Sequence, residues 1–343
     1  MPPLGQAGTQ VCPACGRAAG PEDNFCEACR AELAPAVIST GRPAGTPACP
    51  ACGGTAASPD GFCESCGRKL PDGRDHVELD LGLVAGVTDR GRRRQRNEDA
   101  MALAVTRGED GPAVLAVVCD GVSTSSHADA ASLAAAETTM GVLLAAVRTN
   151  GDLATAAGEA VTAARAALTG LPSEAAGGAP SATFVAAVIG RRQVTVCWLG
   201  DSRAYWLSAS PGAGSQRLTT DDSLAGELMA TGLMSEAEAM GLPQAHVVTG
   251  WIGADLGQAT PHVTTFEPPG PGSVLLCSDG LWNYQPDATA LAGLVLPGAL
   301  TRPLPAAAGL VRFALSAGGR DNVTVVLAPC PSLTPRRMPD EPA

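Results

Sequence analysis

The sequence is poor in three features, each of which would favour a different class of protein. Aromatic residues make up only 3% of the 343 residues, so alanine, valine and leucine must fill most of any core. Basic residues number 23 against 34 acidic ones, and this excess of negative charge disfavours a long surface for nucleic-acid phosphates. No apolar stretch approaches the roughly 20 residues that a bilayer span needs, and no export signal is recognisable. We therefore expect a cytoplasmic protein that binds neither nucleic acid nor membrane.

The cysteines are more numerous than such a protein needs. Eight of the twelve form four CxxC pairs, and the second four repeat the first four at an offset of 37 residues. Four thiolates per unit are the ligands of a closed, structural zinc site, whereas redox motifs and disulfides are the alternatives. The proposed zinc ligands are Cys12, Cys15, Cys26 and Cys29 in the first unit and Cys49, Cys52, Cys63 and Cys66 in the second.

The two cysteine units resemble double zinc-ribbon modules. Each unit is too short to bury a core, so a structural zinc ion would have to supply most of its folding free energy. Residues 1–75 carry six basic and eight acidic side chains, which argues against DNA binding. We expect two structural zinc ions and a role in docking to other proteins.

Aspartates stand at the ends of apolar runs in the rest of the chain. The runs GPAVLAVVCDG, QVTVCWLGDSRAYWL and GSVLLCSDGLW place Asp120, Asp201 and Asp279 after strand-like segments, and Asp321 precedes another in GGRDNVTVVLA. Any one of them could be an ordinary turn residue. Together they indicate an oxygen-ligand site for Mg²⁺ or Mn²⁺, because strands laid side by side bring their ends together.

A basic stretch lies ahead of a pair of acids in TDRGRRRQRNEDA, residues 88–100. It could be a solvated loop. The alternative is a guanidinium that recognises phosphate beside the metal-binding acids Glu98 and Asp99.

In order along the chain, the motifs GRRRQRNED, VVCDGV, GDSRAY, LTTDDSL, LLCSDG and GGRDNVTVV resemble the metal-dependent Ser/Thr protein phosphatase family (type 2C, PPM) in its bacterial form. The resemblance implies an α+β fold, an αββα sandwich of two antiparallel sheets flanked by helices, with two small zinc ribbons ahead of it. The composition agrees: SLAAAETTMGVLLAAV is helical, SATFVAAVI is strand-like and VTVCWLGDSRAYWL has the pattern of a hairpin.

The resemblance also implies a role for each site residue. Asp120 would bridge two Mn²⁺ or Mg²⁺ ions, and the carbonyl of Gly121 would bind one of them. Arg94 would hold the substrate phosphate. Asp279 and Asp321 would complete the ligands of this pair of ions, and Glu98 and Asp99 would act mostly through metal-bound water. Asp201, together with Asp279, would hold a third ion as in bacterial members.

The activity implied is hydrolysis of phosphoserine and phosphothreonine in proteins by a water that bridges the metal ions, within a Ser/Thr kinase signalling pathway. The alternative is an inactive scaffold that binds phosphoproteins; a nucleic-acid binder is a weaker one. Cys119, Cys197 and Cys277 lie in apolar runs and are expected to be core residues rather than nucleophiles.

The expected domain boundaries follow the same motifs. A flap at 218–253 should carry a capping box from Ser235 to Glu238, and His127 is expected to be an exposed loop residue rather than a general acid. Cys330 has no evident role. The predicted segments are a disordered N-terminus at 1–11, zinc ribbon 1 at 12–32, a linker at 33–48, zinc ribbon 2 at 49–70, a linker at 71–77, the phosphatase domain at 78–329 and a disordered tail at 330–343.

Overall fold

A computed structural model gives the fold of this chain. It describes residues 10–11, 17–19, 37–40, 49, 52–56, 58, 62–68 and 73–330, with gaps at 109–110, 126, 174–177, 211, 233, 236–237, 240, 243, 246, 254 and 256–258. The chain divides into two compact units, Met1–Val37 and Ile38–Ala343. In the first unit, β1 (Gln10–Val11) and β2 (Ala18–Ala19) form a small antiparallel sheet.

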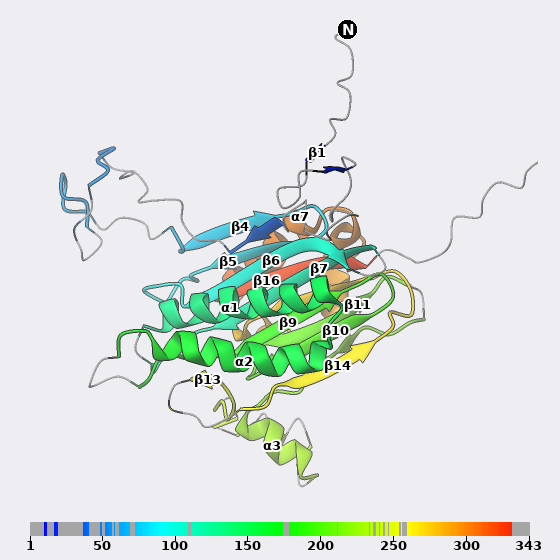
Figure 1. Cartoon of the computed structure of the whole chain (residues 1–343). Coiled ribbons are helices and arrows are strands. Elements are labelled where there is room, and N and C mark those ends of the chain that lie inside the picture. The colour runs from blue at the N-terminus through cyan, green and yellow to red at the C-terminus, as the bar shows by residue number, and fades with distance from the viewer. Residues whose placement is uncertain are drawn as a thin grey trace, which may run out of the picture. The chain divides into compact units, whose positions relative to one another are not determined.

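Two six-stranded sheets form the main body of the second unit (Figure 1). Neighbouring strands from β14 to β6 and from β12 to β4 are antiparallel. The first sheet has the order β14 (His262–Phe266), β10 (Val194–Leu199), β9 (Phe184–Ile189), β7 (Gly111–Asp120), β6 (Asp99–Gly108) and β3 (Val37–Ser39). The second has the order β12 (Gln216–Arg217), β11 (Arg203–Ser208), β15 (Gly272–Cys277), β16 (Val323–Cys330), β5 (Ala85–Asp89) and β4 (His76–Asp80).

Helices cover the outer faces of both sheets. The helices α1 (Ala128–Thr149) and α2 (Leu153–Thr169) pack over the first sheet, in front of it in Figure 1. On the second sheet lie α5 (Asp279–Trp282), α6 (Ala288–Val295), η1 (Gly298–Leu300) and α7 (Pro303–Ala317). The layers confirm the predicted αββα sandwich. The remaining elements are α3 (Leu224–Ala230) and a short sheet of β8 (Ser181–Ala182) with β13 (Ile252–Gly253).

Alternation along the strands explains why their sequences are apolar on both faces. In β15, Val274 and Leu276 point into the core between the two sheets, whereas Leu275 and Cys277 join the cluster under α6 and α7. Because successive side chains of a strand face opposite sides, a strand covered on both faces reads as a continuous apolar run. Because aromatic residues are few, valine, leucine and alanine fill most of the core, as the composition predicted.

Two expectations from the sequence were wrong. The segment VTVCWLGDSRAYWL is not a hairpin, because β10 belongs to the first sheet and β11 to the second. The chain crosses between sheets at Gly200, whose φ of 113° suits glycine. The second wrong expectation is that no apolar stretch is long enough for a membrane span. By length and composition alone α1 could span one, because an 18-residue window of it has a mean hydropathy of 1.6. More than half of that window is buried against β6, β7 and α2, which is the situation of a core helix.

The sheets extend slightly beyond the predicted phosphatase segment. β4 begins at His76, two residues before the expected boundary at 78, and β3 lies inside the expected linker at 33–48. β16 ends at Cys330, which is buried. Gln10–Val11, at the end of the segment expected to be disordered, form β1, whereas residues 1–9 and 331–343 lie outside the described part of the chain.

Candidate active site

Five aspartates lie at the same end of the two sheets. Asp99 begins β6 and stands directly opposite Asp120, the last residue of the neighbouring β7. Asp201 follows β10, Asp279 follows β15 at the start of α5, and Asp321 precedes β16. Antiparallel pairing explains the arrangement, because strands that start at this end alternate with strands that finish there.

Burial and mutual repulsion dominate the electrostatics of these carboxylates. Burial raises the pKa of Asp120 well above its ordinary value, and the charges of Asp99 and Asp279 raise it further. The pKa of Asp279 shifts in the same direction through burial and through Asp201 and Asp321. Burial, with a contribution from a further aspartate, raises the pKa of Asp201 to about 7. Each carboxylate therefore lies within electrostatic reach of the others.

The oxygens of Asp99 have contrasting surroundings. Its Oδ2 accepts hydrogen bonds of 2.7 Å from the hydroxyls of both Ser278 and Thr324. Burial raises the pKa of Asp99 to about 6, although these two donors lower it. Its Oδ1 and the Oδ1 of Asp279 are buried without a hydrogen-bond partner among the described residues.

These observations fit divalent cations. Orphaned carboxylate oxygens in a buried, mutually repelling group need positive charge nearby. Carboxylates are the ligands preferred by Mg²⁺ and Mn²⁺. Asp120, Asp279, Asp321 and Asp201 are the residues that would hold such ions, and their role as metal ligands stays a prediction from the sequence.

Gly121 follows Asp120 where the backbone has no room for a side chain. A Cβ there would overlap the carbonyl oxygens of Ala128 and Glu98. The amide of Gly121 also donates to the Glu98 carbonyl at 3.1 Å. Glycine is thus required for close packing of the loop after β7, and its own carbonyl stays a predicted metal ligand.

Arg94 is the arginine of the basic stretch that reaches the carboxylates. Its guanidinium donates to Asp321 Oδ2 at 2.6 Å and to the hydroxyl of Ser123 at 3.0 Å. The hydrogen bond to Asp321 raises the pKa of Arg94, so it carries a positive charge. About a third of its side chain is exposed, which leaves donor groups open to a ligand. Arg96 lies elsewhere, 3.8 Å from Asp129.

The backbone of Glu98 is bound to the start of β16, and its carboxylate charge also contributes to the raised pKa of Arg94. The Glu98 amide donates to Asn322 Oδ1 at 2.8 Å, and the Asn322 amide group donates to the carbonyls of Arg90 and Arg96. Asn322 thereby fastens the basic loop and the acid pair to the start of β16. Asn322 was not among the site residues predicted from the sequence, although it follows Asp321 directly in GGRDNVTVV.

A buried ion pair beside Asp201 was also missed. Arg203 donates to both oxygens of Asp221, with distances of 2.9 and 2.6 Å, and its guanidinium lies 3.7 Å from the ring centre of Trp282. The indole N–H of Trp282 donates to the carbonyl of Asp201 at 2.9 Å. This network joins the base of the flap to two of the aspartates, since Trp282 is in the helix that begins with Asp279. The motifs GDSRAY and LTTDDSL contain both charged partners.

The flap and the loop after β7 agree with expectation where they are described. Glu238 accepts hydrogen bonds from the amide and hydroxyl of Ser235, at 2.8 and 2.7 Å, and its own amide donates back to Ser235 Oγ at 3.4 Å. This is the predicted capping box. His127 is exposed in a left-handed conformation immediately before α1.

The strand cysteines are core residues. Cys119, Cys197 and Cys277 are at most 2% exposed. Burial raises the pKa of each thiol, and that of Cys197 to about 12. Such thiols stay protonated and are poor nucleophiles.

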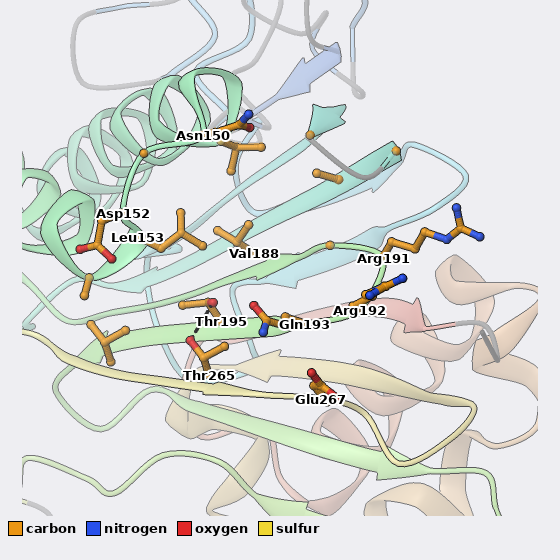
Figure 2. A pocket seen from close by; sticks show the side chains of 18 of the residues that line it. Asn150, Asp152, Leu153, Val188, Arg191, Arg192, Gln193, Thr195, Thr265 and Glu267 are labelled. Carbon is orange, nitrogen blue, oxygen red and sulfur yellow. Dashed lines mark hydrogen bonds between the residues drawn. The ribbon is translucent and has the colours of Figure 1, made fainter. Parts of the chain in front are cut away.

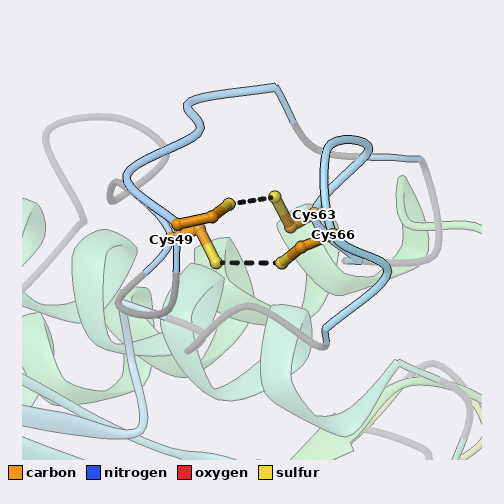
Figure 3. A group of neighbouring side chains, drawn as sticks. Cys49, Cys63 and Cys66 are labelled. Carbon is orange, nitrogen blue, oxygen red and sulfur yellow. Dashed lines mark hydrogen bonds between the residues drawn. The ribbon is translucent and has the colours of Figure 1, made fainter.

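The second cysteine unit forms a compact thiol cluster (Figure 3). Cys49 Sγ lies 3.6 Å from Cys66 Sγ, and Cys52 Sγ lies 3.5 Å from Cys63 Sγ. A tetrahedral zinc ion with bonds of about 2.3 Å requires roughly 3.8 Å between sulfurs, so the four side chains fit zinc. The first unit's ligands, Cys12, Cys15, Cys26 and Cys29, lie outside the described residues.

A cavity of about 570 Å³ lies at the opposite end of the first sheet (Figure 2). It is lined by Gly111, where β7 begins, and by the turn residues Arg191 and Arg192. β7 has 10 residues, which at about 3.3 Å each places this cavity some 30 Å from Asp120. It is therefore separate from the carboxylate centre.

The molecule is thus an αββα sandwich with an acidic centre at one end of its sheets and a cysteine-rich N-terminal region. Residues 88–295 match the family model described as Protein phosphatase 2C, and residues 12–70 match the one described as Double zinc ribbon. The chain belongs to the protein phosphatase 2C family.

Bacterial phosphatases are among the similar sequences. The Serine/threonine phosphatase stp of Listeria innocua is 36% identical over 147 residues, which cover 42% of this chain and 55% of that protein. Protein phosphatase PhpP of Streptococcus pneumoniae is 34% identical over 138 residues, covering 39% and 52%. The chain thus spans about half the length of these relatives.

Solved structures match over more of the chain. The Mycobacterium tuberculosis serine/threonine phosphatase PstP/Ppp has a TM-score of 0.58 and 26% identity, covering 75% of this chain and 100% of that one. A catalytic domain of PstP in complex with two manganese ions has a TM-score of 0.53 and 25% identity, covering 71% and 96%.

Proposed function

We propose that this protein is a protein-serine/threonine phosphatase that depends on Mn²⁺ or Mg²⁺ and acts in the cytoplasm. The observation that carries the proposal is the group of buried aspartates at one end of the sandwich with Arg94 against one of them. The names of the similar proteins support it, and so does the relative's structure with two manganese ions. Asp120, Asp279, Asp321 and Asp201 would hold two or three such cations.

The chain's own residues would bind and orient the phosphorylated side chain. Arg94 can turn its exposed donors to the phosphate oxygens while its bond to Asp321 fixes the head group. When bound, divalent cations supply an activated water and offset charge on the phosphate. The strand cysteines are buried and protonated, which disfavours a covalent cysteine mechanism.

The zinc ribbons would serve docking rather than catalysis. In the second ribbon all four ligand positions are sulfur, and their spacing leaves no open coordination position. We propose that the ribbons bring the enzyme to phosphorylated Ser/Thr proteins of a kinase pathway. Neither nucleic acid nor a membrane is expected as the partner.

The test is phosphate release from a phosphothreonine peptide by the full chain with Mn²⁺. Asp120→Asn should reduce turnover by more than the roughly 10–100-fold that loss of an outer-shell partner costs. The matched control is Asp152→Asn, because Asp152 is an exposed aspartate that caps α2 and asparagine caps equally well. Its turnover should equal that of the wild type. Peptide binding without any phosphate release under Mn²⁺ or Mg²⁺ would instead indicate the scaffold.

A further inference from the structure

The segments on either side of the second zinc ribbon are anchored behind Asp99. Before the ribbon, the hydroxyl of Thr40 donates to Glu137 in α1 at 3.2 Å. After it, Arg74 packs against the start of β6. Thr40 and Arg74 line the same small cavity, together with Asp99. The ribbon therefore leaves and rejoins the catalytic domain at one place.

The guanidinium of Arg74 bridges two elements of the carboxylate centre. One nitrogen donates to the carbonyl of Asp99 at 3.1 Å, and the other donates to the carbonyl of Asp129 at 2.5 Å. Asp99 stands opposite Asp120, and Asp129 lies in the first turn of α1. The loop from Asp120 joins the end of β7, beside the start of β6, to the start of α1. Arg74 therefore holds the start of β6 and the start of α1 together at the two ends of this loop.

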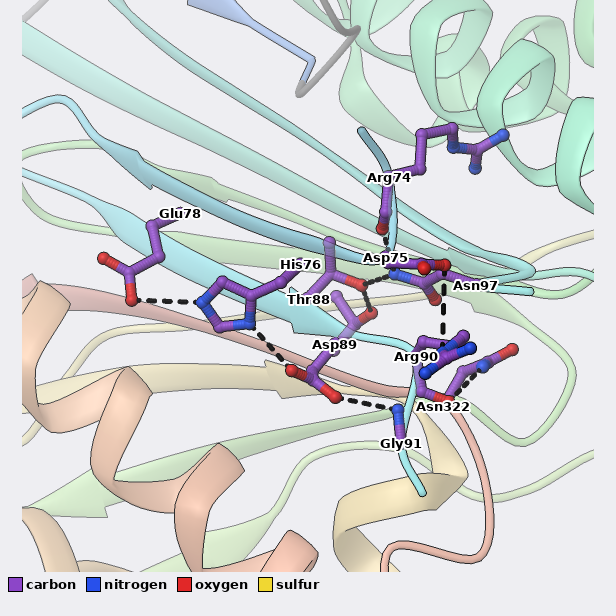
Figure 4. A network of polar contacts seen from close by, with 11 residues as sticks. Arg74, Asp75, His76, Glu78, Thr88, Asp89, Arg90, Gly91, Asn97 and Asn322 are labelled. Atoms are coloured by element: carbon purple, nitrogen blue, oxygen red, sulfur yellow. Dashed lines mark hydrogen bonds and ion pairs between the residues drawn. The ribbon is translucent and has the colours of Figure 1, made fainter. Parts of the chain in front are cut away.

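The backbone of Arg74 reaches the same aspartate by a second route (Figure 4). Its carbonyl accepts from the Asn97 amide group at 2.9 Å, and that group also donates to Thr88 Oγ1 at 2.9 Å. Thr88 and Thr324 hydroxyls are 2.7 Å apart, and Thr324 donates to Asp99 Oδ2 at 2.7 Å. Since the Thr324 proton is used on Asp99, the Thr88 hydroxyl must donate to Thr324. Every hydrogen bond after Asn97 thus points toward the carboxylate.

The chain of donors is buried throughout and fixes one oxygen of Asp99. Asn97, Thr88 and Thr324 are at most 5% exposed. Their hydrogen bonds hold Oδ2, which leaves Oδ1 without a partner among the described residues. The position of Asp99 and of the loop after Asp120 sets how the carboxylates are spaced for a cation.

We propose that Arg74 is a positioning residue through which the segment joining the second zinc ribbon to the catalytic domain sets the Mn²⁺ affinity of the carboxylate centre. The inference rests on the proposed metal-dependent function and deepens it. Outer-shell partners commonly change metal affinity by about 10–100-fold. Because Arg74 lies at the end of the linker from the second zinc ribbon, a change in the conformation of that linker would change the affinity for Mn²⁺.

The test measures Mn²⁺ binding to the full chain by electron paramagnetic resonance, without substrate. Arg74→Ala should bind Mn²⁺ about 10-fold more weakly. Arg74→Lys should recover only part of the affinity, because lysine keeps the charge but cannot bridge two carbonyls with a rigid fork. The matched control is Arg192→Ala, at the exposed turn between β9 and β10, which should bind Mn²⁺ as the wild type does.

A second pair of variants tests the donor chain. Thr88→Val removes the hydroxyl that links Asn97 to Thr324 and should also weaken Mn²⁺ binding. Thr195→Val is the matched control, because Thr195 is equally buried and its hydroxyl lies 2.9 Å from that of Thr265 in the first sheet. Thr88→Val loses two buried hydrogen bonds and Thr195→Val loses one part-buried bond, so thermal unfolding in EDTA should show a larger loss for Thr88→Val. Only Thr88→Val should change the binding of Mn²⁺.

The outcomes separate this inference from the proposed function. If the wild type binds Mn²⁺ and hydrolyses phosphopeptide while Arg74→Ala binds Mn²⁺ equally well, the positioning role is wrong. If the wild type binds Mn²⁺ without hydrolysing phosphopeptide, the proposed function fails and the binding comparison still decides the role of Arg74. A wild type that binds no Mn²⁺ overturns both.

Discussion

The thiol cluster of the second ribbon and the carboxylate centre of the sandwich are built by opposite means. Among the described residues, only the four cysteines place all their ligand atoms within 4.8 Å of one another. Two tight turns position them, with the amides of Gly53 and Gly67 donating to the carbonyls of Cys49 and Cys63. The aspartates are held by strands from two sheets, against their own repulsion. Local backbone thus organises the first site, and the tertiary fold organises the second.

Zinc removal should have the largest effect on stability, and this loss of stability should be confined to the second ribbon. Cys63→Ser removes one thiolate, and structural zinc contributes about 10–16 kcal/mol to such units. We expect one zinc ion fewer per chain by metal analysis, with an unchanged melting temperature of the phosphatase domain. Cys197→Ser is the converse control, since it places a hydroxyl in the buried interior of the phosphatase domain and should lower that temperature while keeping zinc. Loss of the sandwich with the zinc would show that the two sites are not independent.

Gly91 provides a test on the carboxylate side. It has a φ of 76°, and a Cβ there would overlap the carbonyl oxygen of Asp321. Gly82 has the same φ with open space around it. Alanine at Gly82 should therefore cost only the roughly 1–2 kcal/mol of a left-handed conformation. Gly91→Ala should cost at least about 2 kcal/mol more, measured by urea unfolding. Equal costs would mean that the packing behind Asp321 is not tight.

Replacing a repelling carboxylate should stabilise the metal-free protein. Burial raises the pKa of Asp120, so the charged form destabilises the folded state at pH values above the unfolded pKa. Asp120→Asn in EDTA at neutral pH should gain roughly 1–2 kcal/mol in the free energy of unfolding. With Mn²⁺ the order should reverse, because only the wild type binds the ion well. If Asp120→Asn is less stable than the wild type in EDTA, repulsion between the carboxylates does not destabilise the metal-free protein.

The smallest effect concerns an exposed histidine and two neighbouring acids on the second sheet. His76 Nδ1 lies 2.7 Å from Asp89, and Nε2 lies 3.3 Å from Glu78 (Figure 4). Partial burial lowers the pKa of His76, but these acids outweigh it and raise the pKa above its ordinary value. The stabilisation should be complete below the unfolded pKa, near 6.5, and lost as pH rises through the folded pKa. His76→Gln should lower the melting temperature slightly at pH 5.5 and leave it unchanged at pH 9, and equal shifts would exclude a charge effect.

Sequence motifs predicted the fold because several of them stand where an apolar strand stops or starts. The runs before Asp120, Asp201 and Asp279 are strands, and the thiol spacing predicted the second cysteine cluster. The hairpin was wrong because two apolar strands joined by a short turn look alike whether they pair or pass to different sheets. Only the assembled sheets distinguish the two.

The supporting residues were not predictable in the same way. Asn322 and the pair of Arg203 with Asp221 act through contacts between segments far apart in the chain. These residues occur in the motifs that predicted the family. The neighbouring sequence, however, does not show which partner a buried polar side chain has. Arg74 lay in a segment that composition marked as a linker.

The central claim is that the separated aspartates form one site for divalent cations. Crystals grown with Mn²⁺ and measured at the manganese absorption edge test it directly. The account predicts anomalous density among the carboxylates of Asp120, Asp279 and Asp321. Density elsewhere, or none there at saturating Mn²⁺, would contradict it.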